Sequence, residues 1–159
     1  MPYQAVILTV SDSCAAGTRT DTSGPAIRAM LENAGFAVQA MQTVPDEEGQ
    51  ISAAIVHACD ILQADLVVTT GGTGLSARDV TPEATLAVLD REIRAIPVAM
   101  WVEGLKSTPR AMLSRAVAGT RGHTLVLNVP GSEKAARENL GAVVATLDHA
   151  LRMLAGGGH

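Results

Sequence analysis

The stretch Leu66-Val67-Val68-Thr69-Thr70-Gly71-Gly72-Thr73-Gly74 decides the fold class of this chain. Its first five residues are apolar or β-branched, without the polar alternation of a strand that has one solvated face. This pattern predicts a strand buried on both sides. The glycines that follow are typical of a tight turn, because glycine reaches positive φ without steric cost. A strand covered on both faces belongs to a parallel sheet between two layers of helices.

The remainder of the chain alternates predicted strands with predicted helices. We expect strands at residues 5–10, 37–44 and 125–129, and helices at 24–35, 47–62, 81–90, 98–106, 111–118 and 132–154. This order predicts a three-layer α/β/α fold with a mostly parallel sheet. The length of 159 residues is typical of one domain, which we expect to span residues 1–155, with a disordered tail at 156–159.

The composition argues against several classes of protein. A net charge of −4 disfavours nucleic acid as a partner, since a duplex-binding domain carries a basic face. Aromatic residues make up only 2% of the chain (Tyr3, Phe36 and Trp101), too few for a platform on which bases stack. No apolar run approaches the length of a membrane helix, and residues 1–10 lack a secretory signal. We therefore expect a cytoplasmic protein, with Cys14 and Cys59 as free thiols.

Glycine-rich turns mark two candidate anion sites at the predicted strand ends, where ligands of such sheets bind. Gly71-Gly72-Thr73-Gly74 could let backbone N–H groups approach an anionic oxygen, although a tight turn without a ligand explains the glycines equally well. Asn128-Val129-Pro130-Gly131-Ser132 joins a strand to a helix N-terminus, where the helix dipole favours an anion. As a plain helix cap, this second stretch needs no ligand.

Two acidic residues are candidates for holding a divalent cation. Asp79 follows Arg78 between the glycine turn and the predicted helix start Thr81-Pro82-Glu83, whose threonine is the expected N-cap. Mg²⁺ commonly uses one or two carboxylates together with water and phosphate oxygens. In the alternative interpretation, Asp79 caps its own turn and Arg78 is solvated. Asp46, at the end of a predicted strand, is a possible second carboxylate or simply a helix-start acid.

A basic window hides within the acidic chain. Residues 104–132 contain no Asp or Glu but four cations, Lys106, Arg110, Arg115 and Arg121, interleaved with hydroxyl groups. Guanidinium groups match phosphate oxygens in pairs of hydrogen bonds, so the window is a candidate surface for an anionic small molecule. A solvated helix face is the alternative.

Several motifs, taken together and in order, resemble a known family. They are Thr9-Val10-Ser11-Asp12-Ser13, Asp21-Thr22-Ser23-Gly24, Val44-Pro45-Asp46-Glu47, residues 70–74, Arg78-Asp79-Val80-Thr81-Pro82-Glu83-Ala84-Thr85, Ser107-Thr108-Pro109-Arg110-Ala111-Met112-Leu113-Ser114-Arg115 and residues 128–131. The chain is similar along nearly its whole length to the molybdopterin adenylyltransferase family, the group of MogA, MoaB and the gephyrin G domain.

The resemblance implies a MoaB/Mog-like fold, usually trimeric. It also implies Mg²⁺-dependent transfer of AMP from ATP to the terminal phosphate of molybdopterin, with release of pyrophosphate, before a molybdate insertase acts. The family's functional residues fall in three groups. Its catalytic and metal-binding acids match Asp46 and Asp79; its nucleotide turns match Gly71, Gly72, Thr73, Gly74, Asn128, Pro130, Gly131 and Ser132; its molybdopterin side matches Ser11, Asp12, Lys106, Ser107, Thr108, Pro109, Arg110, Ser114 and Arg115.

Two departures from the family pattern concern the pterin side. Gly104 stands where some relatives carry serine, and Ser132-Glu133 replaces an Asn-Pro or Gln-Pro pair. The main alternative to the enzyme is therefore a catalytically weak molybdopterin-binding or scaffold protein of the MoaB type. A second alternative is a relative that acts on another nucleotide, as in CinA-like hydrolases.

Overall fold

The computed structural model describes residues 2–157 of the protein. The strands are β1 (Gln4–Val10), β2 (Ala37–Val44), β3 (Leu66–Thr70), β4 (Arg91–Glu92), β5 (Ala118–Arg121) and β6 (Thr124–Val129). The helices are α1 (Asp12–Ala15), α2 (Ser23–Asn33), α3 (Glu48–Val56), α4 (Thr81–Leu86), α5 (Ala95–Leu105) and α6 (Glu133–Leu154), with the π-helix η1 (His57–Ile61) and the 3₁₀-helix η2 (Pro109–Leu113).

The six strands form one sheet in the order β2-β1-β3-β6-β5-β4. The first four are parallel, and β5 and β4 continue the sheet as antiparallel strands. The predicted mostly parallel sheet is therefore confirmed. Because β2 and β3 lie on opposite sides of β1, the strand order reverses at β1, and in such sheets the crevice outside that point is where ligands bind.

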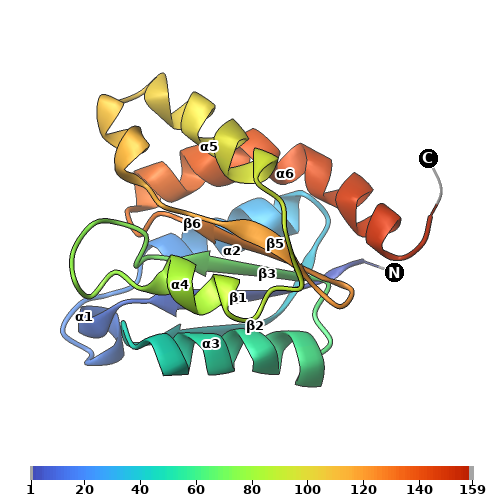
Figure 1. Ribbon diagram of the computed structural model, residues 1–159, viewed down its shortest axis with the longest axis horizontal. Coiled ribbons are helices and arrows are strands. Elements are labelled where there is room, and N and C mark those ends of the chain that lie inside the picture. Colours follow the sequence, from blue (N-terminus) through green and yellow to red (C-terminus); the bar gives the residue numbers. More distant parts are fainter. Residues whose placement is uncertain (1, 158–159) are drawn as a thin grey trace.

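Helices cover both faces of the sheet, which confirms the three-layer architecture (Figure 1). On one face, Ile7, Val68 and Leu127 pack with residues of α2 and α6, and α5 lies against α6. On the other face, Val6, Leu8 and Val67 pack with residues of α3 and α4. Successive strand residues thus feed two separate cores, so the strands contain continuous apolar runs.

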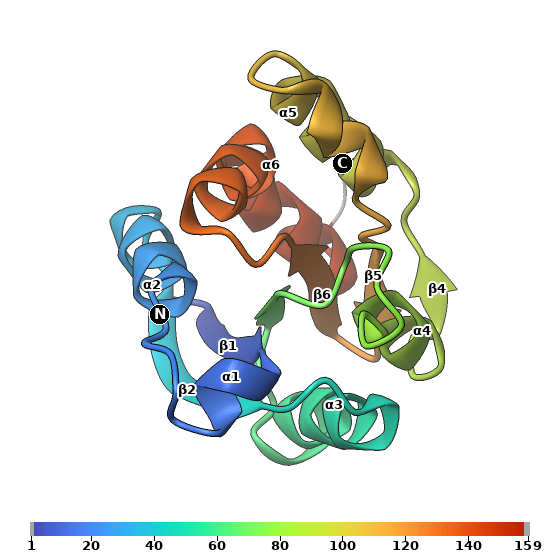
Figure 2. The same ribbon diagram turned by 90° about the vertical axis from the view of Figure 1, so that its left-hand side faces the viewer.

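The carboxyl ends of the parallel strands gather at one end of the molecule, opposite the amino-terminal end of β1 and the carboxyl-terminal end of α6 (Figure 1). Figure 2 looks onto this end, where α1 and the segments between strands and helices meet. No helix within residues 2–157 is both long and apolar enough to cross a membrane.

The structure corrects three local predictions. Residues 111–118 are not a helix: the 3₁₀-helix η2 ends at Leu113, an extended segment follows, and β5 begins at Ala118. The reason is the β5–β6 hairpin, whose turn uses Gly122 at φ 57°. The helix predicted to reach residue 90 ends at Leu86, and the chain then forms β4.

The third correction concerns the start of α4. Its N-cap is Val80, and Thr81 is the first helical residue. The Thr81 hydroxyl is buried without a hydrogen-bond partner among the described residues, so it does not cap the helix.

At the carboxyl terminus, the backbone N–H groups of Gly156 and Gly157 donate to the carbonyls of Met153 and Arg152. The last two residues of the predicted tail, 158–159, lie outside the described part of the chain.

Candidate functional site

A cavity of about 630 Å³ opens at the carboxyl ends of β1, β3 and β6. Its floor is formed by residues that end or directly follow these strands, among them Val10, Thr70 and Pro130. Its walls come from the segment between α1 and α2 and from η2 and the first turns of α6. The cavity therefore lies at the switch point of the sheet, where general rules for open α/β sheets place a ligand.

The glycine turn after β3 is held in a conformation that only glycine adopts easily. Gly71 has φ 102° and Gly72 has φ 69°. A Cβ on Gly71 would meet the Val10 carbonyl oxygen, and one on Gly72 would meet the Thr81 hydroxyl. The tight-turn interpretation is thus sufficient for both glycines, and the turn also lines the cavity. Anion binding by its N–H groups stays a prediction.

Asp46 enters the cavity from the end of β2 and is fixed by its neighbour across the sheet edge. The Asp46 carboxylate accepts the Asp12 N–H at 2.9 Å, and the Asp12 carboxylate accepts the Asp46 N–H at 2.9 Å. Burial raises the pKa of Asp46, and the negative charges of Asp12 and Asp79 act in the same direction. Asp46 is not the cap of α3, whose N-cap is Glu47 without a side-chain bond.

Asp79 closes its own turn and also lines the cavity. One carboxylate oxygen accepts the Ser76 N–H at 3.0 Å and the Ser76 hydroxyl at 2.9 Å. A Cβ built on Gly74 would lie 2.9 Å from the same oxygen, so the glycine leaves room for the carboxylate. The turn-capping role is therefore present, and it leaves the second carboxylate oxygen without a hydrogen-bond donor among residues 2–157.

Arg78 is not a freely solvated cation. Its Nε and Nη2 donate to the two carboxylate oxygens of Asp12 at 3.0 Å each, and Nη2 also lies 2.9 Å from Glu47. These contacts raise the pKa of Arg78, and the guanidinium in turn lowers the pKa of Asp12. Arg78 thus ties the segment before Asp79 to the segments that carry Asp12 and Asp46.

The predicted site residues divide into those that line the cavity and those that do not. Lining it are Asp46, Asp79, Gly71, Gly72, Thr73, Gly74, Pro130, Gly131, Ser132, Ser11, Thr108, Arg110 and Ser114. Outside its lining are Asp12, Lys106, Ser107, Pro109, Arg115 and Asn128.

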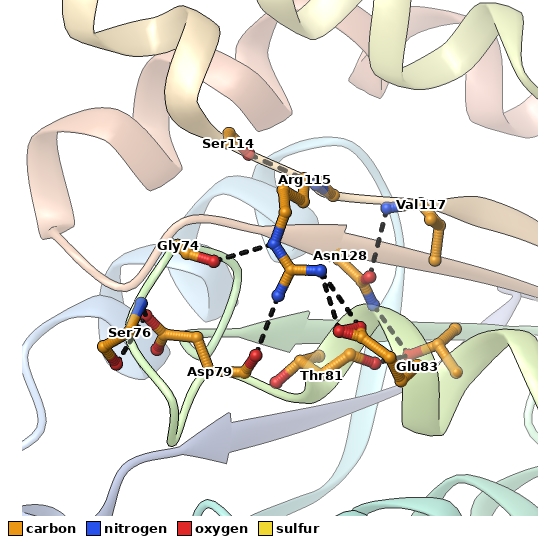
Figure 3. Close-up of polar contacts among 11 residues, drawn as sticks. Gly74, Ser76, Asp79, Thr81, Glu83, Ser114, Arg115, Val117 and Asn128 are labelled. Atoms are coloured by element: carbon orange, nitrogen blue, oxygen red, sulfur yellow. Dashed lines mark hydrogen bonds and ion pairs between the residues drawn. The ribbon is translucent and has the colours of Figure 1, made fainter.

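Asn128 and Arg115 make structural contacts instead. The Asn128 side chain is fully buried, accepts the Val117 N–H at 3.1 Å and donates to the hydroxyls of Thr69 and Thr85 at 2.8 and 3.1 Å. Arg115 contacts the loop that carries Asp79 (Figure 3).

The basic window does not form one continuous patch. Three of its four cations pair with acids from elsewhere: Lys106 with Glu103, Arg115 with Glu83 and Arg121 with Asp60. Only Arg110 lines the cavity, and it has no ion pair among the described residues. The sequence window missed these pairs because each partner lies outside it.

Other lining residues were not singled out from the sequence as ligand contacts. They are Thr9, Val10, Cys14, Arg19, Thr20, Asp21, Thr22, Ser23, Thr70, Gly104, Ala111, Leu113, Ala135, Glu138 and Asn139. Among these, Asp21, Thr22 and Ser23 belong to the Asp21-Thr22-Ser23-Gly24 motif, which was a signal in the sequence. The residues from α6 carried none, because a helix face toward a cavity has the same pattern as one toward solvent. Tyr3, Phe36 and Trp101 are not among the lining residues.

A parallel-sheet domain with paired acids and glycine turns facing one cavity defines a class of small-molecule-binding α/β protein. Comparison with known proteins identifies the family within that class. Residues 6–149 match the family model described as the probable molybdopterin binding domain, and the chain belongs to that family.

Individual relatives agree with this assignment. The chain is 37% identical to the molybdopterin adenylyltransferase of Helicobacter pylori strain J99, over 94% of this chain and 86% of the relative. A crystal structure of the molybdopterin biosynthesis enzyme MoaB from Thermus thermophilus superposes with a TM-score of 0.92 at 49% identity, covering 97% of each chain. Gephyrin of Dictyostelium discoideum is 40% identical over 93% of this chain, which spans only 22% of gephyrin's length.

Proposed function

We propose that this protein is a molybdopterin adenylyltransferase that acts in molybdenum cofactor biosynthesis. The observation that carries the proposal is the meeting of Asp46, Asp79 and both glycine-rich turns at one cavity. Relatives named molybdopterin adenylyltransferase, at 37–41% identity, support the same activity. In this proposal, AMP is transferred from ATP to the terminal phosphate of molybdopterin.

The donor set at the two acids fits Mg²⁺ bound together with a nucleotide. The described residues contain no cluster of three or more His, Cys, Asp or Glu side chains that could hold a metal alone. Two carboxylates plus water and phosphate oxygens are a common Mg²⁺ environment. Burial and the negative charges of Asp12 and Asp79 raise the pKa of Asp46, and a bound cation would favour its ionised form. When bound, Mg²⁺ would neutralise charge on the triphosphate.

The reaction needs positioning rather than a covalent nucleophile. An oxygen of the pterin phosphate attacks the α-phosphorus of ATP, one P–O bond forms, the bond to the β-phosphate bridge breaks, and pyrophosphate leaves. The turns at Gly71–Gly74 and Pro130–Ser132 would hold the nucleotide through backbone N–H groups. Thr108, Arg110 and Ser114 face the same cavity and would hold the anionic pterin.

We extend the proposal to the oligomeric state of the protein, its protein partner and its location in the cell. Val98, Val102 and Leu105 are 48%, 57% and 45% exposed along α5, and this apolar face supports the predicted homotrimer. A relative 41% identical over 98% of the chain is named a molybdenum cofactor biosynthesis bifunctional protein, which supports a link to a molybdate insertase. The free cysteines Cys14 and Cys59 are consistent with the cytoplasm.

The deciding experiment incubates the pure protein with molybdopterin, ATP and Mg²⁺ and measures adenylylated product and pyrophosphate. We expect product from the wild type and loss of turnover in Asp79→Asn, because the amide removes a charge that holds the cation. The matched control is Asp148→Asn, an exposed helix position whose one ion pair within the described part of the chain is with Arg152. Molybdopterin binding without product would instead support the scaffold alternative, and full activity of Asp79→Asn would contradict the assigned role.

A further inference from the structure

One guanidinium bridges the two ends of the loop that carries Asp79 (Figure 3). Arg115 Nε donates to the Gly74 carbonyl at 2.8 Å, and Nη2 donates to the Asp79 carbonyl at 2.8 Å. Nη1 contacts both carboxylate oxygens of Glu83, at 2.7 and 3.1 Å. All three nitrogens of this side chain therefore have protein acceptors.

The backbone of Arg115 is attached to the same turn. Its N–H donates to the Thr73 carbonyl at 2.8 Å, beside the glycine turn. Arg115 lies in the extended segment between η2 and β5. It therefore fixes the loop after β3 to a segment that α4, β4, α5 and η2 separate from it in the sequence. The Arg115 side chain is not part of the cavity lining.

The bonds between Ser76 and Asp79 orient the carboxylate within the loop. Ser76 donates twice to the Asp79 carboxylate, and the Asp79 N–H donates to the Ser76 carbonyl at 3.0 Å. These bonds would travel with the loop if it moved. The guanidinium bonds of Arg115 instead connect the loop to the segment before β5 and to α4, and those of Arg78 connect it to Asp12 and Glu47. Arg115 therefore acts together with Arg78 in setting where the Asp79 carboxylate stands relative to Asp46.

We propose that Arg115 is a positioning residue, which holds the Gly74–Asp79 loop in place and does not itself bind the substrate phosphate. The role rests on the proposed function, because Asp79 is the residue whose position it sets. Direct binding of a phosphate would require the guanidinium to leave two backbone carbonyls and a carboxylate. Lysine cannot replace it, because a single ammonium lacks the planar fork that reaches two acceptors in fixed directions.

Arg115→Met and Arg115→Lys test this role with two measurements. In hydrogen exchange, we expect amides of residues 74–80 to exchange at least about fivefold faster in both variants, with the cores unchanged. In steady-state kinetics, we expect kcat to fall roughly 100-fold, as when a reacting group is displaced by about 1 Å, with KM for molybdopterin close to wild type. Lysine should rescue neither property.

Arg110→Met is the matched control, because Arg110 comes from the same basic window but lines the cavity. It should raise KM for molybdopterin and leave exchange of residues 74–80 unchanged. If Arg115→Met shows the Arg110 pattern, with raised KM and unchanged loop exchange, Arg115 binds substrate and the positioning role is refuted. Rescue by Arg115→Lys would refute it equally, since charge alone would then be sufficient.

The exchange measurement does not depend on the enzyme being active. If the wild type forms no product, the proposed function fails, whereas the loop exchange still reports whether Arg115 fixes the loop. Should Arg115→Met fail to fold, Glu83→Met removes both acceptors of Arg115 Nη1 at the exposed side of the guanidinium. Faster exchange of residues 74–80 in that variant supports the bridge, and unchanged exchange overturns it.

Discussion

Replacing Asn128 by alanine should destabilise the protein strongly without removing a contact to the nucleotide. Asn128 is fully buried at the end of β6, and its amide joins the residue before β5, β3 and α4 through three hydrogen bonds. Each such bond contributes about 1 kcal/mol, and leaving the Val117 N–H buried without an acceptor adds about 1–3 kcal/mol. We therefore expect Asn128→Ala to lower the free energy of unfolding by about 4–6 kcal/mol, a large part of the 5–15 kcal/mol typical of a domain.

The assay is urea denaturation followed by circular dichroism, with ATP affinity measured separately under conditions where the variant is folded. Asn33→Ala is the matched control, since Asn33 is exposed at the end of α2 and its loss should change stability by less than about 0.5 kcal/mol. Thr69→Val should cost about 1 kcal/mol, because it removes one acceptor of the Asn128 amide at nearly constant volume.

The opposite pattern of stability and ATP affinity would refute the structural role of Asn128. If Asn128→Ala changed the free energy of unfolding by less than about 1 kcal/mol and weakened ATP binding about tenfold, Asn128 would be a nucleotide contact, as the family resemblance implies. A double-mutant cycle with Thr69→Val gives a second check, because residues joined by a hydrogen bond should show a coupling energy of at least about 0.5 kcal/mol.

Three further outcomes are expected. The raised pKa of Asp46 means that folding favours its neutral form, so the free energy of unfolding falls as pH rises above 3.8. In thermal melts at neutral pH, Asp46→Asn should therefore be more stable than wild type, yet it should be inactive. Gly71→Ala should cost at least about 2 kcal/mol in urea denaturation, because φ is 102° and a backbone carbonyl blocks the Cβ, whereas Gly49→Ala, with open space in a helix, should be neutral or stabilising. Burial raises the pKa of Cys59 to about 11, so a thiol reagent should label only Cys14 in the folded protein, and equal labelling of both would contradict the buried position.

The strands of the parallel sheet could be predicted from sequence because each carries its own signal. The runs 5–10 and 66–70 are continuously apolar or β-branched, the run 125–129 is so apart from Asn128, and polar residues, glycine or proline follow each run. A doubly covered strand is the simplest interpretation of such runs. The edge of the sheet carried no such signal. β4 has two exposed residues, and β5 contains a glycine and an arginine, so neither shows the period of a strand.

Pairing partners, in contrast, could not be predicted from any window of sequence. The Ala111-Met112-Leu113 run has helical composition, yet Pro109 opens a 3₁₀ turn, and β5 is fixed by its ladder with β6. Local propensity is a weak prior that such tertiary contacts override. The same limit explains why the basic window was interpreted as one patch: its charges are neutralised by Glu83, Glu103 and Asp60.

In the candidate site, too, residue types could be assigned from the sequence, but their interaction partners could not. The acids and glycines at strand ends could be assigned to the cavity because parallel strands bring their carboxyl ends to one edge. The two arginines next to them in sequence or space have a different task, which only the fold reveals: Arg78 ties Asp12 to Glu47, and Arg115 bridges Gly74 and Asp79. A site built on three loops needs such bridges, since no single helix or strand fixes both acids. Substitutions at these arginines should therefore change the geometry of the acids while leaving the other cavity-lining side chains in place.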